Sequence, residues 1–377
     1  MTTIKIAKSD LEAALKVAGN TVGNADLAGH YLFRVLGGKL TILSQNNRVF
    51  SSCPVVASSD EDDVSFTVEA WRISSVVGAT PNNSVLSFEP KNGEVRVVTD
   101  RGKIDLSSLD PSKFPFWDSI LASANETAVI PADRLKSAFA HARMFVSSDE
   151  QQSPQLCVAE FREGVLYSTD KVAVSCIKVE GMEKSSLRVH GKDIGALTTF
   201  LDSAKGTDVV ILEHERAFFV KRSDGAIFGE TLFASKFPTL NGVAWDQSDE
   251  YTWDIFREEF DSNVDLLLSG AQRGETKLSI ALRDGKLVMG MTAVSGKQMA
   301  VDLIPQKSEV KDGAGELPED GFVVSHTHLT TTLGSHSSNL VRVGASAIPK
   351  KGGWVRVQDK RGPDTYLTTI SWIKKTA

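Results

Sequence analysis

The sequence has few cysteines and no long apolar run. Its three cysteines, Cys53, Cys157 and Cys176, are widely spaced and lie among apolar residues. This pattern favours reduced thiols in the core over a disulfide framework or a metal site. No segment approaches the roughly 20 apolar residues that a membrane-spanning helix needs, and the N-terminal Met-Thr-Thr-Ile-Lys-Ile has no apolar signal core. We therefore expect a cytoplasmic protein with no membrane partner.

The common motifs of enzyme active sites are also missing. There is no Gly-x-x-x-x-Gly-Lys-Ser/Thr phosphate loop, no Gly-x-Gly-x-x-Gly before a helix, no Gly-x-Ser-x-Gly elbow and no His-Glu-x-x-His. The histidine cluster, His326-Thr327-His328, places its two rings about 160° apart on a helix, which does not suit a metal. The acidic run 60–63 lacks the ligand spacing of a calcium loop. We predict no catalytic residues, no cofactor and no metal.

The charge balance excludes a protein that is basic overall. The 377 residues carry a formal charge of −6, with 24% charged and 41% apolar residues. A basic surface for nucleic acid would have to be local, against an acidic exterior. A chain of this length suits two or three domains.

One stretch occurs twice. Residues 102–115 and 225–238, shifted by 123 positions, are identical at seven of fourteen positions, and both end in Ser-Lys-Phe-Pro. Chance would give about one match. A repeat of about 120 residues is far longer than the ~20–50 residues of solenoid units, so it indicates duplicated domains.

The order of expected elements recurs three times. Each pass has a strand, a helix, a hairpin with a turn glycine (Gly38, Gly164 and Gly285), a second helix and further strands. The first helix has a candidate capping box, with Ser9 as N-cap and Glu12 three residues on. The third pass, after Trp245, is the faintest. We predict an α+β fold of three tandem domains, each with two helices packed on antiparallel sheets, at residues 1–125, 126–248 and 249–377.

Basic residues gather on several of the expected helices. The helix 132–145 carries Arg134, Lys136 and Arg143 against a single Asp133. Ordinary solvated helix faces explain this pattern, and so does a modest, sequence-neutral phosphate-contacting surface. No stacking aromatic residues are interleaved with these bases, which argues against readout of single strands or of base sequence.

This layout resembles the β sliding clamp, the processivity factor of bacterial replicative DNA polymerases, in a divergent form such as a phage encodes. The resemblance rests on the two Phe-Pro segments at 114–115 and 237–238, on Thr169-Asp170 and on the helix opening at Pro131. It implies a non-enzymatic head-to-tail homodimer that closes into a ring. The ring's helices line a hole for double-stranded DNA, and its partners are a DNA polymerase and a clamp loader.

The resemblance also implies three sets of site residues. The DNA-facing candidates are Lys16, Arg72, Arg134, Lys136, Arg143 and Lys192. The candidates for a partner-peptide pocket are Leu166, Thr169, Val172, Pro238, Leu240, Thr369, Ile370, Ser371 and Trp372. The candidates for the dimer interface are Ile104, Leu106, Leu267 and Leu268.

Several residues depart from the family's pattern. Lys171-Val172 stands where the family has Gly-His-Arg-Leu, and the chain ends in Ile-Ser-Trp-Ile-Lys-Lys where the family has Met-Pro-Met-Arg-Leu. We expect a different peptide preference. Ser269-Gly270 replaces an apolar pair at the interface, and the first helix of the third domain is net acidic. An alternative function is therefore a non-enzymatic adaptor with the clamp fold that binds protein peptides without encircling DNA.

Overall fold

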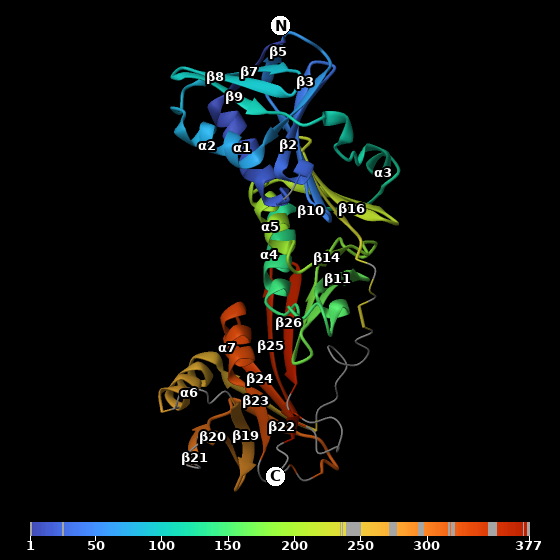
Figure 1. Ribbon diagram of the computed structural model, residues 1–377. Coiled ribbons are helices and arrows are strands. Elements are labelled where there is room, and N and C mark those ends of the chain that lie inside the picture. Colours follow the sequence, from blue (N-terminus) through green and yellow to red (C-terminus); the bar gives the residue numbers. More distant parts are fainter. Residues whose placement is uncertain are drawn as a thin grey trace. The chain divides into compact units, whose positions relative to one another are not determined.

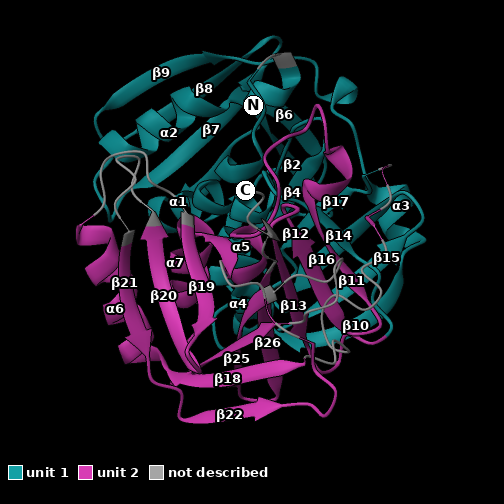
Figure 2. Ribbon diagram, turned by 90° about the horizontal axis from the view of Figure 1, so that it is seen from below, with its two compact units in different colours: residues 1–140, 184–234 teal, residues 141–183, 235–377 magenta. Residues whose placement is uncertain are grey.

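The computed structural model describes residues 2–24, 26–233, 235, 237–238, 250–270, 277–292, 298–315, 317, 321–345, 353–371 and 373–374. It has the mixed helix and antiparallel-sheet composition expected of an α+β protein (Figure 1). No described helix is long and apolar enough to cross a membrane. The chain forms two compact units, Met1–Ala140 with Lys184–Ala234, and His141–Glu183 with Ser235–Ala377 (Figure 2).

The first repeat follows the predicted order of elements. It contains β1 (Ile4–Ala7), α1 (Lys8–Ala18), η1 (Gly19–Thr21), η2 (Asp26–Gly29), β2 (His30–Leu36), β3 (Lys39–Gln45), β4 (Val49–Val55), β5 (Ala57–Ser59), β6 (Val64–Glu69), α2 (Ala70–Ala79), β7 (Val85–Lys91), β8 (Glu94–Thr99), β9 (Gly102–Ser107), η3 (Pro111–Lys113) and α3 (Asp118–Ala122).

The second and third repeats have the same succession. The second contains β10 (Asn125–Pro131), α4 (Ala132–Arg143), η4 (Pro154–Leu156), β11 (Val158–Arg162), β12 (Val165–Thr169), β13 (Ala173–Lys178), β14 (Arg188–His190), α5 (Ile194–Asp202), β15 (Asp208–His214), β16 (Ala217–Arg222) and β17 (Ile227–Thr231). The third contains β18 (Tyr251–Phe256), α6 (Arg257–Ser269), β19 (Lys277–Arg283), β20 (Lys286–Thr292), β21 (Gln298–Leu303), β22 (Lys307–Val310), β23 (Phe322–Ser325), α7 (His326–Ser335), β24 (Leu340–Ala345), β25 (Gly353–Arg361), β26 (Asp364–Ser371) and β27 (Ile373–Lys374).

The three predicted hairpins are present. They are β2–β3, β11–β12 and β19–β20, and their turn glycines Gly38, Gly164 and Gly285 have φ angles of 72°, 78° and 75°. A side chain rarely adopts this left-handed conformation, so glycine is the residue that allows the tight turn. The capping box is wrong. Helix α1 begins at Lys8 with Ala7 as N-cap, because the Lys8 backbone amide donates to the Ser84 carbonyl 2.9 Å away.

Sheets continue from one repeat into the next. In the first unit β17 of the second repeat pairs with β4 of the first, within the strand order β10-β15-β16-β17-β4-β3-β2-β6. In the second unit β26 of the third repeat pairs with β13 of the second, within the order β11-β12-β13-β26-β25-β24-β18-β22. The compact units therefore do not follow the repeat boundaries, and the division at residues 125 and 248 stays a prediction from the sequence.

Each unit also holds a sheet that ends in an open edge. The order β5-β1-β7-β8-β9 leaves β9 with one neighbour, β8, in the described part of the first unit. The order β21-β20-β19-β23-β27 leaves β21 with one described neighbour, β20, in the second unit. An unpaired edge exposes backbone donors and acceptors that another strand can satisfy.

Buried apolar residues alternate along the strands and recur every three to four residues on the helices. In the second unit the core joins α6 and α7 to the sheet through Phe260, Leu333, Val343, Val355 and Ile370. The three cysteines are free and buried. Burial raises the pKa of Cys53 and of Cys176 to about 12, which keeps both thiols protonated at neutral pH.

Candidate nucleic-acid and partner interfaces

Basic side chains from α1 and α4 converge on one carboxylate of α5 in the first unit. Lys136 forms an ion pair with Asp202, and Lys205 and Lys16 act on the same carboxylate. The hydrogen bond from Lys136 and then these positive charges hold the pKa of Asp202 below its usual value. Three cations around one exposed carboxylate leave a local positive charge, although the whole chain is acidic.

The other DNA-facing candidates lie on the same helices or beside them. Arg72 of α2 is exposed, pairs with Glu69 at 2.7 Å, and lies 5.2 Å from the ring of Trp71. Trp71 is 62% exposed and stacks with Arg72, so the expectation of no stacking aromatic among the basic residues is wrong at this position. Arg134 is half-buried on α4, and Lys192 is exposed just before α5. Arg143, the last residue of α4, is exposed and belongs to the second unit.

A half-buried ion pair lies at the start of α5. Arg48 contacts Asp193 at 2.9 Å, and Asp193 is the N-cap residue of the helix. Beside it lies Glu230 of β17, which is 1% exposed and accepts a hydrogen bond of 2.8 Å from the His190 backbone amide. Burial, and then the negative charge of Asp193, raise the pKa of Glu230 well above its usual value.

The pocket candidates divide between the two faces of the second unit's sheet. Side chains alternate along a strand, so Thr169 and Thr369 share one face, and Leu166 and Ile370 lie on the other. Ile370 belongs to the core under the helices, and Leu166 is fully buried. The structure therefore does not bring these four residues together, because an odd separation along a strand reverses the direction of the side chain.

The shared face of Thr169 and Thr369 is linked by a cross-strand row. Thr169 pairs with Val174, and Val174 pairs with Thr369. All three are buried, whereas Val172 is half-buried beside them. The Asp170 carboxylate accepts backbone hydrogen bonds from residues 172 and 173, and its other oxygen lies 2.7 Å from Nε2 of His328 on α7.

Arg162 holds the second Phe-Pro segment. Its guanidinium donates to the carbonyl of Phe237 at 2.6 Å and to that of Pro238 at 3.2 Å, and it lies 5.5 Å from the Phe237 ring. Arg162 pairs with Val165, at the other end of β12 from Thr169. Pro238 is half-buried. Leu240 and Trp372 lie outside the described residues, and of Ser371 the structure describes the backbone in β26.

The interface candidates lie at the two open sheet edges or near them. Ile104 of β9 is 42% exposed, whereas Leu106 is buried in its own unit. Helix α6 lies beside β21, since a Cβ on Gly270 would come within 2.7 Å of the Met299 sulfur. On this helix Leu267 is a core residue and Leu268 is partly buried, because α6 turns these positions toward its own sheet. Leu266, which the sequence analysis did not select, is 59% exposed.

Helix α6 also borders an acidic groove. A hollow of about 960 Å³ is lined by Phe256, Arg257, Glu258, Glu259, Asp261, Ser262, Asp265, Ser338 and Asn339. Four carboxylates face one guanidinium there, as expected from the acidic sequence of this helix. Among the described residues, no group of three or more His, Cys, Asp or Glu side chains could hold a metal ion.

Known proteins are similar to this chain in structure but not in sequence. No protein-family model matches the chain, and no curated protein is similar to it in sequence. The DNA polymerase sliding clamp from Bacillus subtilis is similar with a TM-score of 0.81 and 16% identity, over 100% of both chains. The DNA polymerase III subunit beta from Pseudomonas aeruginosa has a TM-score of 0.79 and 16% identity, over 99% of this chain and 100% of that one.

A third solved structure is similar over the same length. The DNA polymerase III beta subunit from Thermotoga maritima has a TM-score of 0.80 and 12% identity, over 100% of both chains. The resemblance noted in the sequence is therefore confirmed for the fold. The chain has the fold of the bacterial DNA polymerase sliding clamp, although its sequence is only 12–16% identical to these structures.

Proposed function

We propose that the protein is a DNA sliding clamp, a non-enzymatic processivity factor of the cytoplasm. In this proposal a head-to-tail homodimer encircles double-stranded DNA and tethers a DNA polymerase, after a clamp loader has placed it on DNA. The three solved structures named above are clamps or polymerase III beta subunits by their names, and all are covered over their full length.

The open sheet edges carry the proposal. Strand β17, at the end of the second repeat, pairs with β4, and strand β26, near the end of the third repeat, pairs with β13. Strands β4, β13 and β21 occupy the same place after each repeat's hairpin, and β9, β17 and β26 the same place near each repeat's end. A strand near the end of one repeat thus pairs with the strand after the hairpin of another repeat. Among the described strands, β9 and β21 are the two in these positions that have no such partner. A second copy supplies both, in head-to-tail order.

The basic residues suit a hole that holds DNA without reading its sequence. Lys16 and Lys136 meet around Asp202, and Arg72 is exposed on α2. Lysine and arginine on helices attract phosphates at any sequence, and an acidic exterior repels them. A partner peptide would bind on the face of Thr169, Val174 and Thr369. These three residues are buried, so the peptide would have to displace the side chains that cover them. The half-buried Val172 is where it would first make contact.

The acidic groove along α6 favours the alternative, an adaptor with the clamp fold that does not encircle DNA. Glu258, Glu259 and Asp265 would repel phosphates if this helix faced a duplex. The two functions predict different behaviour on DNA. A clamp stays on circles and is lost from linear ends, whereas an adaptor binds peptides and ignores DNA.

The molar mass in solution and retention on DNA test the proposal together. We expect a mass near twice 40.8 kDa by light scattering that persists on dilution. Loaded on nicked circular DNA, the protein should stay bound through gel filtration and leave when the circle is cut. A monomer that is never retained on circles, with or without a loader, would support the adaptor instead.

A further inference from the structure

A charged row continues the predicted peptide-binding face across the third repeat's strands. Thr369 of β26 pairs with Arg356 of β25, which pairs with Arg342 of β24, which pairs with Asp254 of β18. Residues paired in this way point to the same side of a sheet. Thr169, Val174 and Thr369 are the other members of this row. One straight row therefore runs from the face of Thr169, Val174 and Thr369 into a line of charged side chains.

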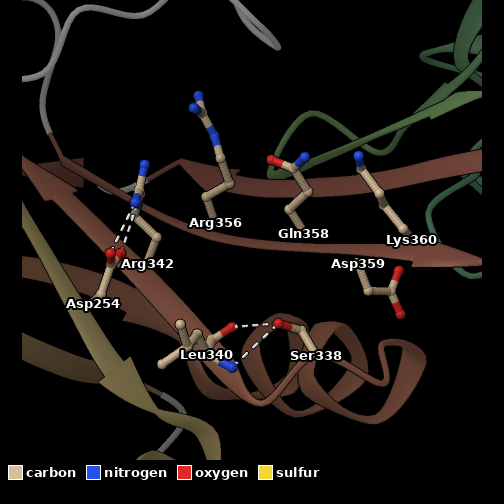
Figure 3. A pocket seen from close by; sticks show the side chains of 8 residues that line it. All are labelled: Asp254, Ser338, Leu340, Arg342, Arg356, Gln358, Asp359 and Lys360. Atoms are coloured by element: carbon tan, nitrogen blue, oxygen red, sulfur yellow. Dashed lines mark hydrogen bonds and ion pairs between the residues drawn. The ribbon is translucent and has the colours of Figure 1, made fainter. Parts of the chain in front are cut away.

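The charged end of the row borders a hollow of about 330 Å³. Figure 3 shows Arg356, Gln358 and Lys360 side by side on β25, with Arg342 across from them and Asp359 on the other side of the strand. Lys360 and Gln358 are exposed. We call Arg342, Arg356 and Lys360 the cationic patch.

The two arginines are held in place by their neighbours. The Arg342 guanidinium binds both oxygens of Asp254, at 2.6 and 2.8 Å. Arg356 lies 4.1 Å from the ring of Trp354 and donates to the Thr369 hydroxyl at 3.4 Å. On this face of β22, β18, β24 and β25 the side chains carry four cations and two carboxylates, so a net positive charge remains: Lys307, Arg342, Arg356 and Lys360, with Asp254 and Glu309.

The opposite face of the same strands is covered by helices. Val341, Val343 and Val357 are buried in the core with residues of α6 and α7. The end of α4 lies on that side too, because Ser168 donates to the Ala142 carbonyl at 2.9 Å. The cationic patch thus points away from the helices of its unit, on the face that carries Thr169 and Thr369. This position favours a protein segment over the DNA that the helices would contact.

We propose that the cationic patch binds acidic side chains of the partner segment whose apolar residues lie on the face of Thr169, Val174 and Thr369. This inference rests on the proposed peptide-binding function and specifies its partner as an acidic one. Arginine and lysine form charge-assisted hydrogen bonds with carboxylates, and the Trp354 ring beneath Arg356 supports that guanidinium. Strands lie about 4.8 Å apart, so Arg342 is roughly 10 Å from Thr369. An extended segment covers this distance in about three residues, which sets where the acidic residues should fall.

Labelled synthetic peptides test the inference by fluorescence anisotropy. Three peptides share one apolar segment, the tightest binder from a peptide library screened on this protein, and carry four glutamates, four glutamines or four lysines, beginning three residues from its apolar end. We expect the glutamate peptide to bind about tenfold more tightly than the glutamine peptide at low salt, and the lysine peptide more weakly than either. Added salt should shrink the difference, because charges at an interface rim are screened.

Substitutions then identify the patch. Lys360→Glu should remove the preference for glutamate and leave the affinity of the glutamine peptide unchanged. Arg356→Gln should also remove the preference. Lys286→Glu, an exposed lysine on β20 in the other sheet of the unit, is the matched control and should keep the preference. Equal binding of the glutamate and glutamine peptides to the wild-type protein would overturn the inference while leaving peptide binding intact.

Two further outcomes would also overturn it. If no library peptide binds to a protein that is dimeric and retained on circular DNA, the peptide pocket fails and the acidic segment fails with it, although the clamp function stands. If Lys360→Glu weakens DNA retention without changing peptide affinity, the patch is a nucleic-acid surface.

Discussion

His141 and His336 contact the same hydroxyl group, that of Thr368. Nε2 of His141 lies 3.1 Å from this oxygen and Nε2 of His336 lies 2.9 Å from it. Their ring centroids are 4.8 Å apart, and both residues are buried. His141 comes from α4 and His336 follows α7, so one hydroxyl of β26 joins the ends of two helices in the second unit.

This arrangement makes the second unit sensitive to acid. Burial, then the neighbouring His336 and Arg361, lower the pKa of His141 to about 3. In the unfolded chain a histidine takes up a proton near pH 6.5. Between these values the unfolded state binds more protons than the folded state, so stability falls as the pH drops from about 6.5 to about 3. In this range His141 lowers the free energy of unfolding by at most about 1.4 kcal/mol for each pH unit of acidification.

The substitution His141→Gln should flatten this slope. Glutamine does not titrate, and its amide can still bond to Thr368. Thermal unfolding between pH 4 and 7 checks the expectation, with His214→Gln, a half-buried histidine of the first unit, as the control. The variant should lose less stability on acidification than the wild type, whatever its stability at pH 7. Parallel curves for variant and wild type would show that His141 is not responsible.

Glu230 should act in the opposite direction. Its folded pKa is raised, so above about pH 4.3 the unfolded chain releases a proton that the fold keeps, and stability falls as the pH rises toward the folded pKa. Oε2 of Glu230 has no hydrogen-bond partner among the described residues. Glu230→Gln removes the titration and offers an N–H to the neighbouring Asp193.

We expect Glu230→Gln to raise the midpoint of unfolding at pH 8 by several degrees, since about 1 kcal/mol shifts it by 2–4 °C in a protein unit of this size. At pH 4 the change should be close to zero. Glu94→Gln, an exposed carboxylate in the first unit, should have no effect at either pH. A destabilised Glu230→Gln at pH 8 would mean that the carboxylate is ionised and paired in the fold.

The repeat and its hairpins could be predicted because their signals are local. Gly38, Gly164 and Gly285 sit where a left-handed turn is needed, and the strands around them alternate apolar and polar residues. The sequence also allowed Lys16 and Lys136 to be placed on helices and listed together as DNA-facing candidates. Their shared partner Asp202 could not be predicted, because it lies 66 residues beyond Lys136.

The features that sequence reasoning missed depend on long-range pairing. The start of α1 is set by Lys8 contacting Ser84, which a local capping pattern does not reveal. The cationic patch requires the register between β24, β25 and β26, and that register brings Arg342 opposite Arg356. The division of Thr169 from Leu166 could have been found from strand alternation alone. Both residues were predicted to line one pocket because they match the family's pocket positions in the sequence. Such a match does not say to which face of the sheet each side chain points.

Ile104→Asp should break the proposed dimer. Ile104 is the exposed apolar residue of the open strand β9, and an aspartate in its place would be buried without a partner. We expect at least a hundredfold weaker association, seen as a fall in molar mass toward 40.8 kDa at micromolar protein. Val56→Asp is the control, because Val56 is 80% exposed in the same unit and outside the predicted interface. Unchanged mass for Ile104→Asp would place the interface elsewhere.

The pair Lys16→Glu and Lys136→Glu should weaken retention on DNA at every sequence alike. Both lysines act on Asp202, and reversing their charges turns the cluster from net positive to net negative. Each lost phosphate contact lowers the dependence of log K on log salt by about 0.9, so the double variant should show a slope smaller by about 2. Binding to a linear duplex with blocked ends, titrated at several salt concentrations, measures this slope.

The matched control for the lysine pair is Lys39→Glu with Lys113→Glu, two exposed lysines of the same unit that lie off the long helices. It changes the net charge of the chain by the same amount. A clamp should lose affinity with the helix pair alone, because the phosphates contact the helices inside a ring. If both double variants lose affinity equally, the effect comes from total charge, and α1 and α4 do not line a DNA channel. If neither does, the basic helix faces are ordinary solvated surface, and the acidic α6 becomes the better guide to what the protein binds.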